Sequence, residues 1–147
     1  MTSWKEFAAQ APEIATFGQE RFSSGVAYLA TVRADGGPRV HPVTPILGDK
    51  LFLFMEPTSP KRHDLLREPR YALHCAVENS EGGGGEFYVR GRATLIDDPI
   101  VREEAVKAAS YTPADRYILF LLTVNFAFMN TYDDNGPNPR RWQASHE

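Results

Sequence analysis

The sequence has one cysteine, no excess of positive charge and no long apolar run, and each absence excludes a class of protein. A single Cys75 in 147 residues excludes an internal disulfide framework. The net charge of −3 argues against a general binder of nucleic acid or anionic membranes. The longest apolar run, residues 118–129, is interrupted by Thr123 and Asn125 and falls short of the ~20 residues of a membrane-spanning helix. We therefore expect neither a nucleic-acid nor a membrane partner.

Motifs for metal and nucleotide binding are also missing. The four histidines form neither an H-x-H nor an H-E-x-x-H pattern, so no metal site is expected. The glycine run at residues 82–85 lacks the Gly-Lys-Ser/Thr ending of a phosphate-binding P-loop and indicates a turn between strands. The first residues show no basic-then-apolar secretion signal, and we expect a cytoplasmic protein.

The composition that is present, 42% hydrophobic and 24% charged, is that of an ordinary globular protein. A chain of this length matches one domain of usual size, so a single domain is predicted over residues 1–147. Residues 1–24 are predicted to form a helical arm, because an S-x-x-E capping pattern at residues 3–6 precedes Pro12 at a second helix start. Residues 133–147 are predicted to be a polar C-terminal tail.

Short β-type runs separated by Gly- and Pro-rich turns occupy the rest of the chain. The predicted strands cover residues 25–32, 39–46, 51–55, 70–77, 86–96 and 118–132. Helices are predicted from Pro60 to Pro69 and from Pro99 to about Ser110. Tight turns such as residues 35–37 imply antiparallel pairing. We therefore predict a mainly β fold, a six-stranded antiparallel barrel with flanking helices.

The helix predicted at Pro60 begins with an unusual cluster of charge. Lys61 and Arg62 lie in its first turn, where the helix dipole and free N–H groups favour negative charge by about 0.3–1 kcal/mol. With Ser59 as the cap, the same groups form an anion site, and Arg39 at the start of the second strand can reach the same anion. We interpret the cluster as a phosphate site, the alternative being a solvated basic turn.

These elements, in this order, resemble the pyridoxamine 5′-phosphate oxidase-like superfamily, the flavin-binding split barrels. The resemblance covers residues 25–96 and rests on the following segments: 28–32 (YLATV), 35–43 (DGGPRVHPV), 59–65 (SPKRHDL), 69–70 (PR) and 91–93 (GRA). It implies that the predicted barrel is a split β-barrel. It also implies FMN as cofactor, a homodimer with the flavin at the subunit interface, and a small-molecule substrate that the sequence does not identify.

The resemblance assigns cofactor contacts to specific positions. Arg39, Ser59 and Lys61 match positions that hold the flavin phosphate, and Arg62 becomes an auxiliary cation. The wall against the ribityl chain and the isoalloxazine ring matches residues Val40, His41, Pro42, Val43, Thr44, Phe54 and Met55.

More distant contacts and some departures follow from the same resemblance. Glu86 falls near a position that contacts the ring or its linker, and Trp142 near one that reaches the partner's flavin. Thr44 replaces a substrate-associated lysine of the authentic oxidases, Pro60 replaces a basic residue, and their C-terminal Arg-x-His pattern is missing. Oxidation of pyridoxamine phosphate is therefore not the expected activity.

The leading hypothesis is an FMN-dependent oxidoreductase that transfers hydride at flavin N5 to or from a small organic substrate. One alternative is a reductase of the same fold that uses F420. Another is a non-catalytic protein that carries or senses flavin or haem. No catalytic side chain is predicted, because hydride transfer needs no protein nucleophile. His41 is the candidate for a proton donor, and a side chain that only faces flavin or solvent is the alternative.

Overall fold

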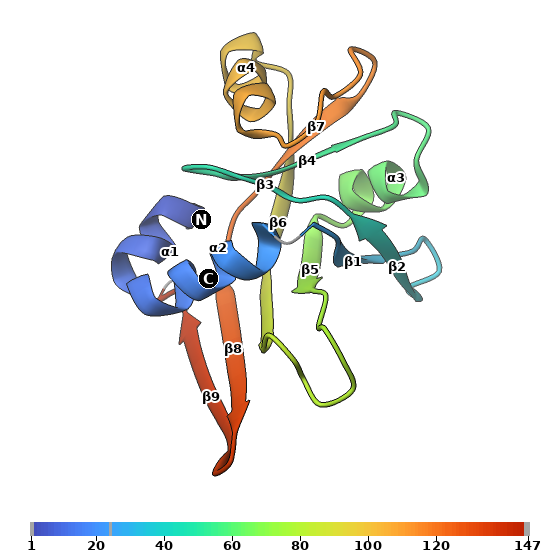
Figure 1. Cartoon of the computed structure of the whole chain (residues 1–147). Helices are drawn as coiled ribbons and strands as arrows, with labels where there is room; N and C mark the ends of the chain where they lie inside the picture. Colours follow the sequence, from blue (N-terminus) through green and yellow to red (C-terminus); the bar gives the residue numbers. More distant parts are fainter. Residues whose placement is uncertain (1, 24, 146–147) are drawn as a thin grey trace.

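The computed structural model describes residues 2–23 and 25–145 (Figure 1). Two helices open the chain, α1 (Trp4–Gln10) and α2 (Pro12–Ser23). The Ser3 hydroxyl accepts a hydrogen bond from the Glu6 amide at 3.1 Å, which caps α1 as the sequence pattern indicates. No helix among the described residues is long and apolar enough to cross a membrane.

The strands form one curled antiparallel sheet that wraps into a half-barrel (Figure 1). The described strands are β1 (Ala27–Val32), β2 (Pro38–Val43), β3 (Ile46–Leu47), β4 (Leu51–Met55), β5 (Arg70–Cys75), β6 (Glu86–Ile96), β7 (Ile118–Leu122), β8 (Phe126–Asp133) and β9 (Gly136–Gln143). Their order is β2-β1-β5-β6-β7-β4-β3, with β8 pairing with β6 and β9. Helices α3 (Pro60–Arg67) and α4 (Pro99–Ala108) flank the sheet. The predicted split barrel with flanking helices is confirmed.

Nine strands are described where six were predicted, and one of the three additional strands arises because the segment 118–132 forms two strands rather than one. Strand β7 pairs with β4 and with the end of β6, whereas β8 pairs with the beginning of β6. At the polar break between them, the amides of Thr123 and Asn125 donate to the carbonyls of Arg92 and Arg90 at 2.9 and 2.7 Å. The 11-residue β6 is long enough to pair with both β7 and β8. This double pairing depends on β6 and cannot be predicted from residues 118–132 alone.

Two further strands come from a segment predicted as one strand and from the segment predicted as a polar tail. The stretch 39–46 divides into β2 and the short β3, which pairs with β4. The polar tail contributes β9, which pairs with β8 along its whole length. This hairpin extends away from the body of the molecule (Figure 1). Strand β9 is mostly exposed and lies at a sheet edge, where Pro137 and Pro139 are tolerated.

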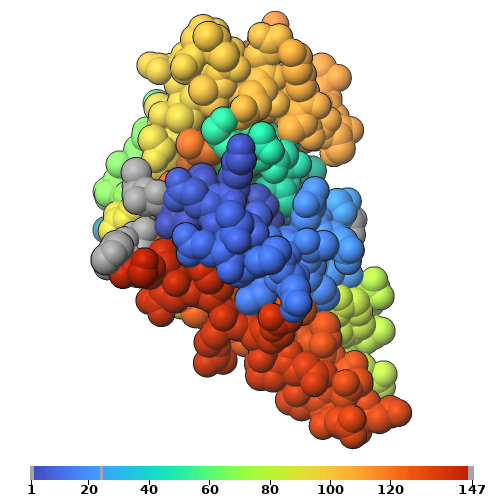
Figure 2. Space-filling view, turned by 90° about the vertical axis from the view of Figure 1, so that its left-hand side faces the viewer, coloured from blue at the N-terminus to red at the C-terminus, as the bar shows by residue number. Residues whose placement is uncertain are grey.

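The main core lies inside the half-barrel and includes Leu29, Leu73, Phe87 and Phe120, each fully buried. Helices α1 and α2 cover one side of it, and the ring of Phe22 packs edge-on against Phe87 at 5.1 Å. Figure 2 shows the two helices in blue, lying between the α4 region and the β8–β9 hairpin. The opposite side, near the start of α3, is left open for a pocket.

Candidate cofactor pocket

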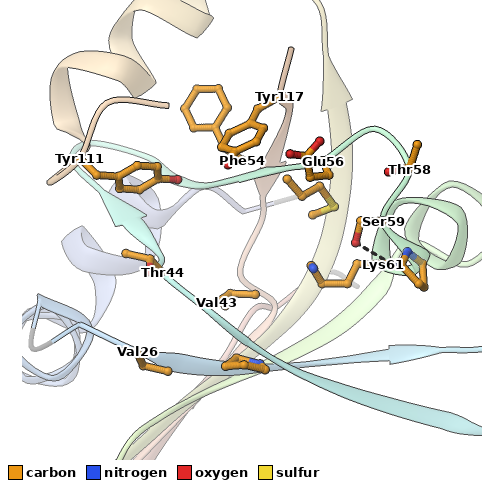
Figure 3. A pocket seen from close by; sticks show the side chains of 13 residues that line it. Val26, Val43, Thr44, Phe54, Glu56, Thr58, Ser59, Lys61, Tyr111 and Tyr117 are labelled. Atoms are coloured by element: carbon orange, nitrogen blue, oxygen red, sulfur yellow. Dashed lines mark hydrogen bonds between the residues drawn. The ribbon is translucent and has the colours of Figure 1, made fainter. Parts of the chain in front are cut away.

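A pocket of about 680 Å³ lies between β2, β4 and the N-terminus of α3 (Figure 3). Cofactor and ligand sites typically occupy roughly 300–1,000 Å³. These three elements follow one another closely in the sequence, but β2 and β4 lie toward opposite ends of the strand order, and the curl of the sheet brings them together here. The pocket has a polar end at α3, an apolar wall formed by Pro42, Val43 and Met55, and an aromatic end.

The polar end is the capped start of α3. Ser59 is the N-cap and is buried, and its hydroxyl accepts a hydrogen bond from the Lys61 amide at 3.3 Å. The Lys61 side chain reaches into the pocket beside it (Figure 3). Burial lowers the pKa of Lys61, and its ammonium group has no carboxylate partner in the described part of the chain. A partly desolvated cation at a helix N-terminus forms a site for an anion.

Arg39 lies next to this end but is held by a carboxylate that the sequence did not single out. Its Nε donates to Asp64 Oδ2 at 2.7 Å, and the same oxygen accepts the Thr31 hydroxyl at 2.7 Å. Arg67 donates to Asp64 Oδ1 at 3.2 Å and to the Val32 carbonyl at 2.6 Å. Asp64 therefore ties β1 and β2 to α3. Among the described residues, the terminal nitrogens of Arg39 have no hydrogen-bond partner, so they remain available to an anion.

Asp64 is only 2% exposed, and its ionisation reflects two opposed influences. Burial raises the pKa of its carboxyl, but the hydrogen bonds from Arg39, Thr31 and Arg67 outweigh burial and hold the pKa below its ordinary value. A lowered pKa means that the carboxylate stabilises the fold above the unfolded-state pKa of about 4, and that this contribution is lost as the pH falls further.

We expect Asp64→Asn to lower the free energy of unfolding at pH 7 by about 3 kcal/mol, because Arg39 and Thr31 lose a buried charged acceptor. The difference from the wild type should shrink as the pH falls below about 4, because Asp64 of the unfolded wild-type chain, which has the higher pKa, then takes up a proton first and favours unfolding. Urea unfolding from pH 7 to pH 3 measures both effects, with the exposed Asp97→Asn as the control. Equal stability of Asp64→Asn and the wild type at pH 7 would contradict the role of the Asp64 carboxylate in holding β1 and β2 to α3.

His41 lies on the same face of β2 as Arg39, two residues along the strand. Its Nε2 is shielded from solvent and has no hydrogen-bond partner among the described residues. Burial lowers the pKa of His41, and the positive charges of Lys61 and Arg39 lower it further against the opposing influence of Asp64. The imidazole is therefore held neutral beside the polar end, able to donate or accept one hydrogen bond.

Some of the predicted contact residues line the pocket and others do not, Arg39 and His41 being among those that are absent from its lining. The pocket gathers Pro42, Val43, Thr44, Phe54, Met55, Ser59 and Lys61. Val40 points outward from β2 and is 64% exposed. Arg62, next to Lys61, does not line the pocket, and its Nε is buried without a described partner.

Glu86 and Trp142 lie outside the pocket of their own chain. Glu86 accepts hydrogen bonds from Tyr132 at 2.7 Å and from Asn130 at 3.2 Å, at the far end of β6. The Trp142 ring packs against Phe7 at 4.9 Å and joins β9 to α1. Their proposed flavin contacts therefore require the flavin of a second subunit.

The aromatic end of the pocket was missed by the sequence reasoning. Tyr111 and Tyr117, from the loop between α4 and β7, lie near Phe54, and Glu56 follows β4 along the same rim (Figure 3). The only signal in the sequence is the presence of two tyrosines in an otherwise polar loop. Irregular loops have no periodicity that would indicate which side chains turn inward.

The fold is thus a split barrel whose pocket has the capped, cationic start of α3 at one end. The family model for pyridoxamine 5′-phosphate oxidase matches residues 11–124, and the chain belongs to this family. Comparison with proteins of curated function gave no match.

Solved structures with the same fold include an FMN-binding protein and proteins that bind or store haem. A pyridoxamine 5′-phosphate oxidase-related, FMN-binding protein from Nostoc punctiforme is similar with a TM-score of 0.67 and 15% identity, over 92% of this chain and 91% of that one. HutZ, a haem storage protein from Vibrio cholerae, has a TM-score of 0.56 and 18% identity, over 78% and 89%. A haem-binding protein from Mycobacterium smegmatis has a TM-score of 0.62 and 16% identity, over 79% of this chain. The match covers only 52% of that longer protein.

Proposed function

We propose that the chain binds FMN in this pocket and acts as a flavin-dependent oxidoreductase on a small organic substrate. The observation that carries the proposal is Lys61, a partly buried cation without a carboxylate partner in the described chain, placed at the capped start of α3. The terminal phosphate of FMN would lie against Lys61, the Ser59 cap and the free N–H groups of the helix. The FMN-binding relative of the same fold supports this assignment.

The rest of the pocket fits the remainder of the cofactor. Pro42, Val43 and Met55 provide an apolar wall for the ribityl chain and one side of the ring. Bound flavin supplies hydride transfer at N5, so the protein has to bind, orient and shield rather than provide a nucleophile. His41, whose imidazole is neutral, can hydrogen-bond the phosphate from β2, while Arg39 presents its terminal nitrogens from beside Asp64.

The direct experiment is to purify the protein, record its visible spectrum and identify any released chromophore by mass spectrometry. We expect a flavin spectrum, or its appearance on titration with FMN. A protein that stays colourless and binds neither FMN, F420 nor haem would overturn the cofactor proposal. Tight binding of F420 without FMN binding would replace the proposed cofactor by the deazaflavin.

Haem carriage is the second candidate, favoured by the two haem-binding relatives of the same fold. A Soret band in the purified protein, without flavin, would support it against the FMN proposal. If FMN is bound, reduced flavin should be reoxidised faster by an organic acceptor than by oxygen alone. The absence of any such acceptor across a broad panel would favour a carrier or sensor over an enzyme.

A homodimer is proposed from an aromatic row on the outer face of the sheet. Tyr28 pairs in register with His74, His74 with Tyr88, and Tyr88 with Phe128, so the row crosses β1, β5, β6 and β8. Tyr88 stacks with His74 at a ring separation of 5.9 Å and contacts Phe128 at 5.4 Å. Tyr28 remains 46% exposed. A continuous aromatic face of this kind is suited to a second copy of the chain.

We expect Phe128→Glu to convert a dimer to a monomer, because a charge would be buried at the centre of that interface. Light scattering after size-exclusion chromatography measures the mass. Ile100→Glu, on the exposed surface of α4, is the matched control and should leave the mass unchanged. A wild-type monomer at high protein concentration would contradict the proposal.

A further inference from the structure

The two ends of the pocket differ in charge, and this difference bears on the substrate. Figure 3 shows Ser59 and Lys61 at one end and Phe54, Tyr111 and Tyr117 at the other. Lys61 provides the cation of the first end. The aromatic end offers no comparable free cation among the described residues, although two arginines lie close to it.

Arg102 is one of these arginines, and the backbone of the neighbouring loop takes up three hydrogen bonds from its guanidinium. It donates to the backbone carbonyls of Tyr117 at 2.7 Å, Asp115 at 3.2 Å and Ala114 at 3.3 Å. It also lies over the ring of Phe54 at 5.0 Å from the centroid. Arg102 therefore holds the loop that carries Tyr117 in place, and it is not among the residues that line the pocket.

Arg116 is the other arginine, and Glu56 neutralises it. Arg116 Nε donates to both carboxylate oxygens of Glu56, at 2.9 and 3.0 Å, and its terminal nitrogen donates at 2.5 Å. The hydrogen bond from Arg116 holds the pKa of Glu56 below its ordinary value, so this carboxyl is ionised. Of this pair, Glu56 is the member that lines the pocket. An anion entering here would meet a carboxylate first.

The polar groups left at this end are hydroxyls. Tyr111 and Tyr117 line the pocket, and neither phenol has a hydrogen-bond partner in the part of the chain that the structure describes. Burial, with a smaller contribution from Tyr117, raises the pKa of Tyr111, so its hydroxyl stays protonated. Phe54 and the two tyrosine rings supply faces for stacking. The hydroxyls can donate to the oxygens of a bound ligand.

We propose that the aromatic end is the substrate subsite and that it selects uncharged, planar compounds with oxygen acceptors over anionic ones. The inference rests on the proposed FMN function, in which the cationic end is occupied by the cofactor phosphate. Tyr111 and Tyr117 bind the acceptor oxygens, and Glu56 excludes carboxylates and phosphates. This selection agrees with Thr44 at the position where the authentic oxidases have a substrate-associated lysine.

The test compares two ligands of one shape, naphthalene-2-carboxamide and naphthalene-2-carboxylate, on the FMN-loaded protein. Binding is followed by the change in the absorption and fluorescence of the bound flavin. We expect the amide to bind roughly tenfold more tightly than the carboxylate, a difference of about 1.4 kcal/mol. Equal binding of the two, tighter binding of the carboxylate, or binding of neither up to millimolar concentration would overturn the inference.

Glu56→Gln should largely remove the discrimination, because it removes the carboxylate and frees Arg116 for a ligand. We expect the affinity for naphthalene-2-carboxylate to rise roughly fivefold, with the amide little changed. Glu104→Gln, which instead breaks the pair with Lys50 outside the pocket, is the control and should change neither. Unchanged carboxylate affinity in Glu56→Gln would contradict the exclusion by Glu56.

Tyr111→Phe and Tyr117→Phe should each weaken the binding of naphthalene-2-carboxamide by roughly three- to tenfold, because each variant loses one neutral hydrogen bond to the ligand. Tyr132→Phe, whose hydroxyl donates to Glu86 outside the pocket, is the control. Unchanged amide affinity in both pocket variants would overturn the assigned role of the hydroxyls. FMN affinity is measured first in every variant, so failure to bind FMN tests the proposed function and the ligand pair tests the subsite.

Discussion

Replacement of Gly91 by alanine is expected to lower the free energy of unfolding by about 4 kcal/mol or more, among the largest effects of a single substitution. Gly91 lies in β6, opposite Tyr71 of β5. A Cβ at this position would lie 1.9 Å from the carbonyl oxygen of Thr123, which is backbone and cannot rotate away. The same oxygen accepts the hydroxyl of the buried Tyr71 at 2.7 Å. Relief of the overlap therefore breaks a buried hydrogen bond and displaces the junction between β7 and β8.

Thermal and urea unfolding measure the effect, and we expect a decrease in Tm of about 10 °C or more. Gly48→Ala is the matched control, because a Cβ there would make an ordinary 3.5 Å contact with Ala108. That variant should stay within about 1 kcal/mol of the wild type. If Gly91→Ala were as stable as Gly48→Ala, the close approach of β6 to Thr123 would be wrong.

Lys61→Ala is expected to weaken FMN binding by about 2–3 kcal/mol, roughly 30- to 150-fold in Kd, while riboflavin binding changes little. The physical reason is that the ammonium is partly desolvated in the free protein and has no ion-pair partner in the described chain. A phosphate dianion would be its main counter-charge. Riboflavin has the same ring and ribityl chain without the phosphate.

Isothermal titration with both flavins gives the comparison. Lys107→Ala removes an exposed lysine of α4 that pairs with Glu103, and it serves as the control for a lost positive charge. Equal losses for FMN and riboflavin in Lys61→Ala would mean that the phosphate lies elsewhere. Arg39→Ala should likewise weaken FMN binding more than riboflavin binding. It should also lower the stability of the protein, because Asp64 then loses a hydrogen-bond partner.

The cationic helix start is the part of the site that the sequence predicted best, because its physics is local. Ser59, Pro60 and Lys61 are consecutive, and the cap, the first turn and the charge are defined by neighbours in the chain. The structure forms that cap and directs Lys61 into the pocket. The predicted wall residues Val43, Phe54 and Met55 also line it, since β2 and β4 lead directly into the same region.

The setting of Arg39 could not be predicted in the same way. In the sequence, Asp64 is one acidic residue in a polar helix segment, and nothing near it in the chain indicates burial. It is buried because α3 packs against β1. Only that packing turns the carboxylate into the acceptor for Arg39 and Thr31. Likewise, Tyr117 belongs to a loop that Arg102 of α4 holds by its backbone carbonyls, and Glu56 is held by Arg116, 60 residues away in the sequence.

By itself the sequence determined the mainly β class, the capped and cationic helix start, and the segments that mark the family. These depend on period, capping and charge, which act over a few neighbouring residues. Only the tertiary structure decided that β6 serves both β7 and β8, that the polar tail becomes β9, and that the aromatic end faces the pocket. Those outcomes depend on pairing and burial between distant segments, whose energies appear only when the half-barrel has formed.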